Sequence, residues 1–195
     1  MNTLVLEEHG EHEVAVNVYQ RLADNRILFI NSYIDDRVAV DITASLLMKD
    51  IQDPLNKISI FLNAYGGSTR SVFMIYDMMK TVRAPVEVIC MGAALNEAAL
   101  ILAAGTPGMR YATPNAMVCL SQLMYGGSHY SDLSGAQITM EQIALDNKKF
   151  IEALAANINK PFKKVMEDLD RKKYLNAQQT KKYGLIDGIV KVKKK

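Results

Sequence analysis

The chain has 195 residues and a formal net charge of +2, and 49% of its residues are hydrophobic. This length and composition predict one compact domain with a substantial core. The nearly balanced charge gives no reason to expect binding to nucleic acid. A membrane protein is not expected, because no apolar run approaches the ~20 residues that a span requires. The N-terminus also lacks the basic-then-apolar pattern of a signal peptide.

The two cysteines point to the compartment in which the chain works. Cys90 and Cys119 both lie in apolar, strand-like runs. Cysteines in such runs are usually buried free thiols, and free thiols persist in reducing surroundings. We therefore expect a cytoplasmic protein.

In chain order, the pattern predicts a polar arm, one domain and a short tail. Residues 1–14 are rich in Glu and His and are expected to form a mobile N-terminal arm. A single domain then covers residues 15–190, and residues 191–195 form a basic tail. Within the domain, short apolar runs typical of strands occur at residues 27–30, 58–62, 86–91 and 116–120. Helical patterns alternate with them at residues 38–48, 71–82 and 96–104. This β-α-β-α order predicts an α/β fold with strands buried between helices.

A long helix is predicted over residues 135–158, after a Gly-rich stretch at residues 125–131. Its apolar residues lie on more than one side, so it needs more partner surface than one small domain offers. An ordinary core helix is the alternative interpretation.

The most informative segment runs from residue 86 to residue 105. A strand-like run reaches Gly92 and gives way to a helix of small residues. A turn of this kind places one side chain in a cleft beside free backbone N–H groups, which suits a nucleophile and an oxyanion site. The side chain at that position is Asn96, which can form hydrogen bonds but cannot attack a carbonyl carbon.

This segment resembles the serine-bearing segment of the proteolytic subunit of the Clp ATP-dependent protease. The resemblance continues through further segments in the same order, at residues 63–68, 75–77, 111–115 and 183–187. It covers roughly residues 15 to 190. It implies a ClpP/crotonase-like spiral of β-α-β units with a protruding strand-helix handle, through which two seven-membered rings stack.

The resemblance also implies that the catalytic triad is absent. The family has serine, histidine and aspartate where this chain has Asn96, Ser121 and Lys172. The oxyanion positions are Gly67 and Glu97, whose N–H groups would survive any change of side chain. A carboxylate pointing inward would oppose a developing oxyanion, so we expect the Glu97 side chain to point away.

The function implied is that of a pseudoenzyme, a non-catalytic subunit like the ClpR subunits. It would form rings, alone or with an active ClpP paralogue, and shape the degradation chamber of a heptameric or tetradecameric serine protease complex. No cofactor or metal is expected. Its compartment would be the cytoplasm, or the plastid stroma in a photosynthetic eukaryote.

The partner implied is an AAA+ unfoldase such as ClpX, ClpA or ClpC. By register, the residues that line its docking pocket are Phe61, Ile89, Met91, Tyr111 and Val190. Polar residues replace apolar ones nearby, at Ser59, Thr81 and Thr113. Because each lost apolar contact lowers affinity, we expect weak docking.

Two other functions remain open at this point. Ser121 and Lys172 could form a displaced Ser–Lys dyad and give an active peptidase, although the charged run around Lys172 indicates solvent. Alternatively, the shared spiral fold allows a crotonase-like acyl-CoA enzyme or binder. Glu97 and Glu141 are the candidate carboxylates for it.

Overall fold

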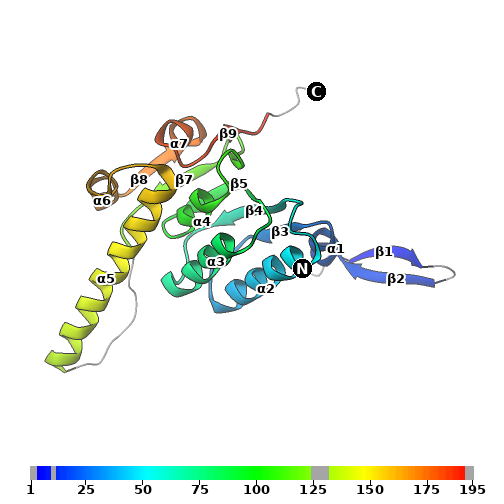
Figure 1. The fold of residues 1–195 in the computed structure, drawn as a ribbon, viewed down its shortest axis with the longest axis horizontal. Coiled ribbons are helices and arrows are strands. Elements are labelled where there is room, and N and C mark those ends of the chain that lie inside the picture. Colours follow the sequence, from blue (N-terminus) through cyan, green and yellow to red (C-terminus); the bar gives the residue numbers. More distant parts are fainter. Residues whose placement is uncertain (1–3, 10–11, 124–131, 192–195) are drawn as a thin grey trace.

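The protein is a mixed α/β domain built on a parallel sheet, in a computed structural model that describes residues 4–9, 12–123 and 132–191 (Figure 1). The main run of strands has the order β3-β4-β5-β6-β9, and every neighbouring pair in it is parallel. The bounds of these strands are Ile27–Ile30 (β3), Ile58–Ala64 (β4), Val86–Leu95 (β5), Arg110–Ala112 (β6) and Gly188–Ile189 (β9). The predicted α/β class is thus confirmed.

Strand β5 is longer than predicted and pairs with two different strands along one edge. Its first half pairs with β6, and its second half pairs with β7 (Met117–Leu120). β8 (Lys173–Asn176) then adds antiparallel to β7. At Gly92 φ is +96°, and a Cβ there would lie 2.6 Å from Oδ1 of Asn63. Glycine therefore lets the strand continue to Leu95, past the predicted end at Met91.

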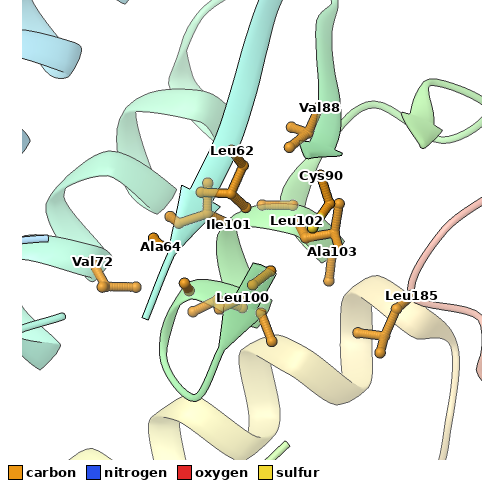
Figure 2. Close-up of a cluster of buried hydrophobic side chains, with 14 of the residues drawn as sticks. Leu62, Ala64, Val72, Val88, Cys90, Leu100, Ile101, Leu102, Ala103 and Leu185 are labelled. Carbon is orange, nitrogen blue, oxygen red and sulfur yellow. The ribbon is translucent and has the colours of Figure 1, made fainter. Parts of the chain in front are cut away.

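Helices cover one face of the sheet. They are α2 (Asp36–Gln52), α3 (Thr69–Thr81) and α4 (Ala98–Ala104). All of the residues of α4 are buried, and small side chains let this helix lie close to the strands. Figure 2 shows Leu100, Ile101 and Leu102 of α4 packed with Leu62 and Cys90 of the sheet. Cys90 is a buried free thiol as predicted, and burial raises its pKa to about 12.

The opposite face of the sheet is less covered. Phe29 and Phe61 stack there on neighbouring strands, with ring centroids 5.2 Å apart. Ile89 and Tyr111 continue this row across β5 and β6, because Phe61 pairs with Ile89 and Ile89 pairs with Tyr111. The short helix α1 (Val18–Asp24) borders the row through Tyr19, whose ring meets Phe29 edge-on.

The two ends of the chain extend the domain. β1 (Leu4–His9) and β2 (His12–Asn17) pair antiparallel, so the N-terminal arm contains regular strands and the second strand passes the predicted boundary at residue 14. α5 (Leu133–Ile158) projects away from the sheet (Figure 1). α6 (Phe162–Asp170) and α7 (Ala177–Tyr183) pack near its C-terminal end. Within the described ranges, no helix has both the length and the apolar character to cross a bilayer.

Helix α5 begins two residues before the prediction and ends where predicted, at Ile158. Its buried residues lie only in its C-terminal part: Phe150, Ile151, Leu154, Ala155 and Ile158. Large apolar side chains in its N-terminal part are exposed, including Leu133 and Ile138. The helix is therefore not an ordinary core helix within this chain.

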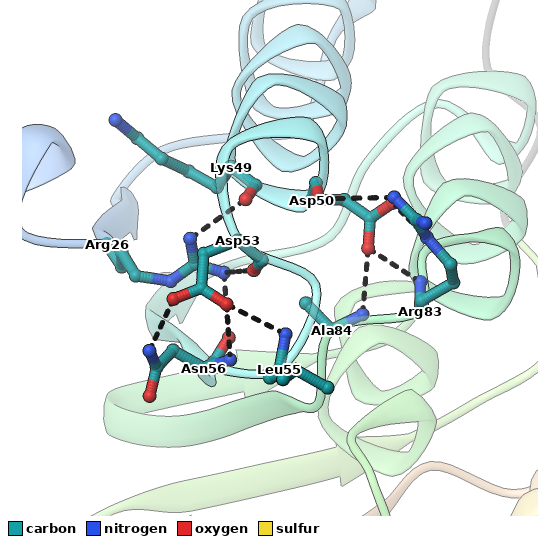
Figure 3. Close-up of polar contacts among 8 residues, drawn as sticks. All are labelled: Arg26, Lys49, Asp50, Asp53, Leu55, Asn56, Arg83 and Ala84. Carbon is teal, nitrogen blue, oxygen red and sulfur yellow. Dashed lines mark hydrogen bonds and ion pairs between the residues drawn. The ribbon is translucent and has the colours of Figure 1, made fainter.

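Arg26 connects α2 to the start of β4 (Figure 3). Its guanidinium group donates hydrogen bonds to the backbone carbonyl oxygens of Lys49, Asp53, Asn56 and Lys57, at 2.7 to 3.1 Å. These contacts join the last turn of α2, at Lys49, to the loop that follows it and to the start of β4. Arg26 itself has φ of +63°, and the bonds hold it in this uncommon conformation.

A second polar cluster fixes β6 to β9. The Asp187 carboxylate accepts bonds from the backbone N–H groups of Gly108 and Arg110 and from the Arg110 side chain. The shortest of these contacts, from Arg110 Nη2, is 2.6 Å. Arg110 also donates to the carbonyl oxygen of Asn157 in α5. The cluster therefore joins the sheet to the long helix.

Candidate functional site

The turn between β5 and α4 places Asn96 at the end of the central strand. Asn96 has φ of +54°, in the left-handed region that asparagine tolerates better than most residues. Its N–H donates to the carbonyl oxygen of Cys119 at 2.9 Å, which ties the turn to β7. This is the sharp strand-to-helix turn that carries the nucleophile in many hydrolases. The helix begins at Ala98, two residues later than predicted.

The side chains at two of the three predicted triad positions meet. The Ser121 hydroxyl donates to Oδ1 of Asn96 at 2.8 Å. Ser121 is buried, and Asn96 is partly buried. The serine hydroxyl is therefore engaged by an amide that has no basic atom, so this pair does not activate either residue as a nucleophile.

Lys172 lies apart from this pair. It immediately precedes β8 and is exposed. Among the described residues, no hydrogen bond or ion pair joins it to Ser121 or to any other group. A lysine that acts as a base is normally buried, and Lys172 is exposed.

The paired glycines form a tight corner beside Asn96. Gly66 has φ of +124°, and Gly67 pairs with Ile34 through an isolated bridge. A Cβ on Gly67 would lie 2.6 Å from the Cβ of Ile34, which leaves no room for a side chain. Both glycines are thus required by the backbone.

The Glu97 side chain was expected to point away from this corner, and that expectation is wrong. Glu97 is only 5% exposed, and its Oε2 accepts a hydrogen bond from the N–H of Gly67 at 3.3 Å. The same oxygen lies 2.9 Å from where a Cβ on Gly66 would be. The expectation considered only repulsion of a reaction intermediate. A resting carboxylate instead gains a donor from the glycine corner.

The described histidines and Glu141 do not add to this site. His9 and His12 pair in the β1–β2 strands, and His129 lies outside the described residues. Glu141, the second carboxylate of the crotonase interpretation, is exposed on α5 and accepts a bond from Gln137. The described ranges also contain no group of three or more His, Cys, Asp or Glu side chains able to hold a metal ion.

The predicted docking residues lie on the less covered face of the sheet. Phe61 and Met91 line a hollow of about 210 Å³ together with Tyr19 and Phe29. Ile89 and Tyr111 continue the same face beyond the hollow.

Val190 and Ser59 lie at the borders of this sheet face. Val190 follows β9, is partly exposed, and donates its N–H to the carbonyl oxygen of Ala112. Ser59 forms a hydrogen bond with Glu87 at 2.8 Å, which adds a polar strip beside the aromatic row. The docking role itself stays a prediction.

These features define a mixed α/β protein with a parallel sheet and a strand-to-helix turn at Asn96, the position predicted to correspond to a nucleophile. Comparison with known proteins agrees with this class. The Clp protease family model matches residues 9–193. The ATP-dependent Clp protease proteolytic subunit 1 of Tropheryma whipplei is 38% identical over 175 residues, which cover 90% of this chain and 84% of the relative.

Two further relatives show the same similarity. Proteolytic subunit 2 of Corynebacterium jeikeium is 39% identical over 91% of this chain and 85% of its own length. Proteolytic subunit 2 of Streptomyces coelicolor is 39% identical over 90% of this chain and 80% of its own length. The chain belongs to the Clp protease family.

Proposed function

We propose that this chain is a non-catalytic subunit of a Clp-type ATP-dependent protease, which forms part of the proteolytic chamber. The observation that carries the proposal is Asn96 at the nucleophile turn, with its amide oxygen bound by Ser121. A serine peptidase needs a nucleophile, a base in contact with it and a group that orients the base. The described side chains around Asn96 do not supply that set.

The architecture supports a structural role in an assembled ring. The exposed apolar side chains of α5 need a partner surface, and a second copy or an active paralogue in a stacked seven-membered ring would provide it. In such a ring this chain would contribute wall surface, influence which partners join, and lower the number of cleaving sites.

The test uses the purified chain and two reagents. A short fluorogenic peptide measures turnover, and a fluorophosphonate probe labels any activated serine. We expect neither turnover nor labelling. A label on Ser121 would support the displaced Ser121/Lys172 dyad instead and would overturn this proposal. Acyl-CoA binding or turnover would support the crotonase-like alternative.

We also propose that this subunit binds the AAA+ unfoldase weakly and leaves most docking to its paralogue. Phe61 and Met91 offer apolar surface in the hollow, but the Ser59–Glu87 pair places polar groups beside it. Loss of two or three apolar contacts makes the free energy of unfoldase binding less favourable by about 2–4 kcal/mol. Binding of an unfoldase to a homo-oligomer of this chain with the affinity of an active subunit would contradict this.

A further inference from the structure

We propose that the Glu97 carboxylate is a built-in occupant of the corner where an oxyanion would form, and so blocks acyl transfer independently of the lost triad. The inference deepens the proposed function and rests on it. It concerns a side chain that the triad comparison does not include. It also identifies the class of ligand that this corner binds, a carboxylate.

The contacts place the carboxylate in the corner. Glu97 Oε2 accepts the N–H of Gly67, and a Cβ on Gly66 would lie 2.9 Å from the same oxygen. The ideal Cβ position on Gly66 is also 3.6 Å from Nδ2 of Asn96, so the carboxylate, the amide and the glycine corner enclose one small space. Glu97 is almost completely buried there.

The corner has little room to move away from the carboxylate. Ile34 N–H donates to the Gly66 carbonyl oxygen at 3.0 Å, and Ser68 N–H donates to the Ile34 carbonyl oxygen at 2.8 Å. Gly67 is also packed against Ile34 and Val72. These contacts with Ile34 and Val72 fix the orientation of the Gly67 N–H, which points toward Glu97.

An oxyanion needs the group that Glu97 already uses. The donor N–H must face the oxygen on which negative charge develops, in a site free of other anions. Here the donor is engaged, and a second negative charge beside the first would be repelled. Restoring the triad alone would therefore leave the acyl-transfer site occupied.

The direct test is a pair of crystal structures of the assembled protein, both grown with sodium formate. In the unmodified chain we expect a Glu97 oxygen within hydrogen-bond distance of the Gly67 nitrogen. In Glu97→Ala we expect formate bound at that nitrogen. A Glu97 side chain turned into solvent, or a corner that stays free of formate in the variant, would overturn the proposal.

The chemical test uses fluorophosphonate labelling of triad-restored variants. One variant carries N96S, S121H and K172D, and a second adds Glu97→Ala. Removal of one oxyanion donor typically costs 100-fold or more in rate, so we expect the second variant to label about 100-fold faster. Equal rates would overturn the proposal. Adding Glu167→Ala instead is the matched control, because Glu167 is an exposed glutamate on α6, and it should leave the rate unchanged.

The outcomes separate this inference from the proposed function. Labelling of the unmodified chain would contradict the proposed function. Equal labelling of the two restored variants would contradict only the role of Glu97. If the restored triad does not become reactive in either variant, the two crystal structures decide the question.

Discussion

Two groups of polar residues in this molecule differ in how their side chains are connected. Around Asp187, a carboxylate and a guanidinium share several hydrogen bonds and join the sheet to α5. At the triad positions, Asn96 and Ser121 share one bond and Lys172 stands in solvent. The comparison shows a connected charged pair where the sheet meets α5, and no charged pair among the three residues at the predicted triad positions.

The largest loss of stability is expected when Asp187 is replaced. Asp187→Asn leaves the nearly buried Arg110 without its counter-ion, which costs about 3 kcal/mol in the free energy of unfolding. Chemical denaturation at pH 7 measures the change. Glu167→Gln, at an exposed glutamate, is the control and should change stability little. A loss below about 1 kcal/mol for Asp187→Asn would remove the contrast between the two clusters.

The contacts of Asp187 also predict that the stability of the folded protein depends on pH. The hydrogen bond from the Arg110 side chain, with further help from backbone N–H groups, holds the pKa of Asp187 below its usual range. A carboxyl group whose pKa is lowered on folding stabilises the protein above its unfolded pKa of about 3.9, and this stabilisation is lost as the pH falls through the folded pKa.

The stability gap between the unmodified chain and Asp187→Asn should therefore stay constant from pH 7 to 5. It should close as the pH falls below about 4. Thermal or chemical denaturation across this range measures it. If this stability difference instead disappeared as the pH rose above 7, the pH dependence could not be assigned to Asp187.

A smaller effect is expected at Arg26. Arg26→Lys replaces a planar fork that reaches four carbonyl oxygens with a single ammonium group. We expect a loss of about 2 kcal/mol, since several hydrogen bonds from a charged donor disappear. Arg37→Lys, at an exposed arginine in the first turn of α2, serves as the matched control. Equal effects of the two changes would show that the carbonyl contacts of Arg26 contribute little.

The smallest effect expected is at the triad positions, and a double-mutant cycle measures it. Ser121→Ala should cost about 1 kcal/mol, and its coupling with Asn96→Ala should be about 0.5–1 kcal/mol. Its coupling with Lys172→Ala should be close to zero, because those side chains share no bond. A clear coupling between positions 121 and 172 would instead favour the displaced dyad.

The parts of the fold that could be predicted are those set by local patterns. The strand at residues 27–30 has the predicted bounds, because short apolar runs between turn residues identify buried strands. The continuation of β5 through Gly92 could not be read locally, since it depends on contact with Asn63 and pairing with β7. The same limit applies to the N-terminal strands, whose pairing requires two segments to meet.

At the candidate site, position in the chain was predictable and side-chain direction was not. The sequence order identified Asn96 as the residue at the turn. The inward orientation of Glu97 depends on the Gly66–Gly67 corner, which is 30 residues away in the chain. The paired glycines were a usable signal, because a corner without side chains leaves space for a neighbouring carboxylate.

The shape of α5 has a consequence for how fast its backbone exchanges hydrogen with solvent. None of residues 133–149 is buried in the single chain, whereas Phe150 and the residues that follow it anchor the helix. At 1.5 Å per residue, this part without buried residues extends about 25 Å. Its amides should exchange rapidly in a dissociated subunit and slowly in a ring, while those of the anchored end stay protected in both. The exchange rate along this single helix thus reports how much of the protein is assembled.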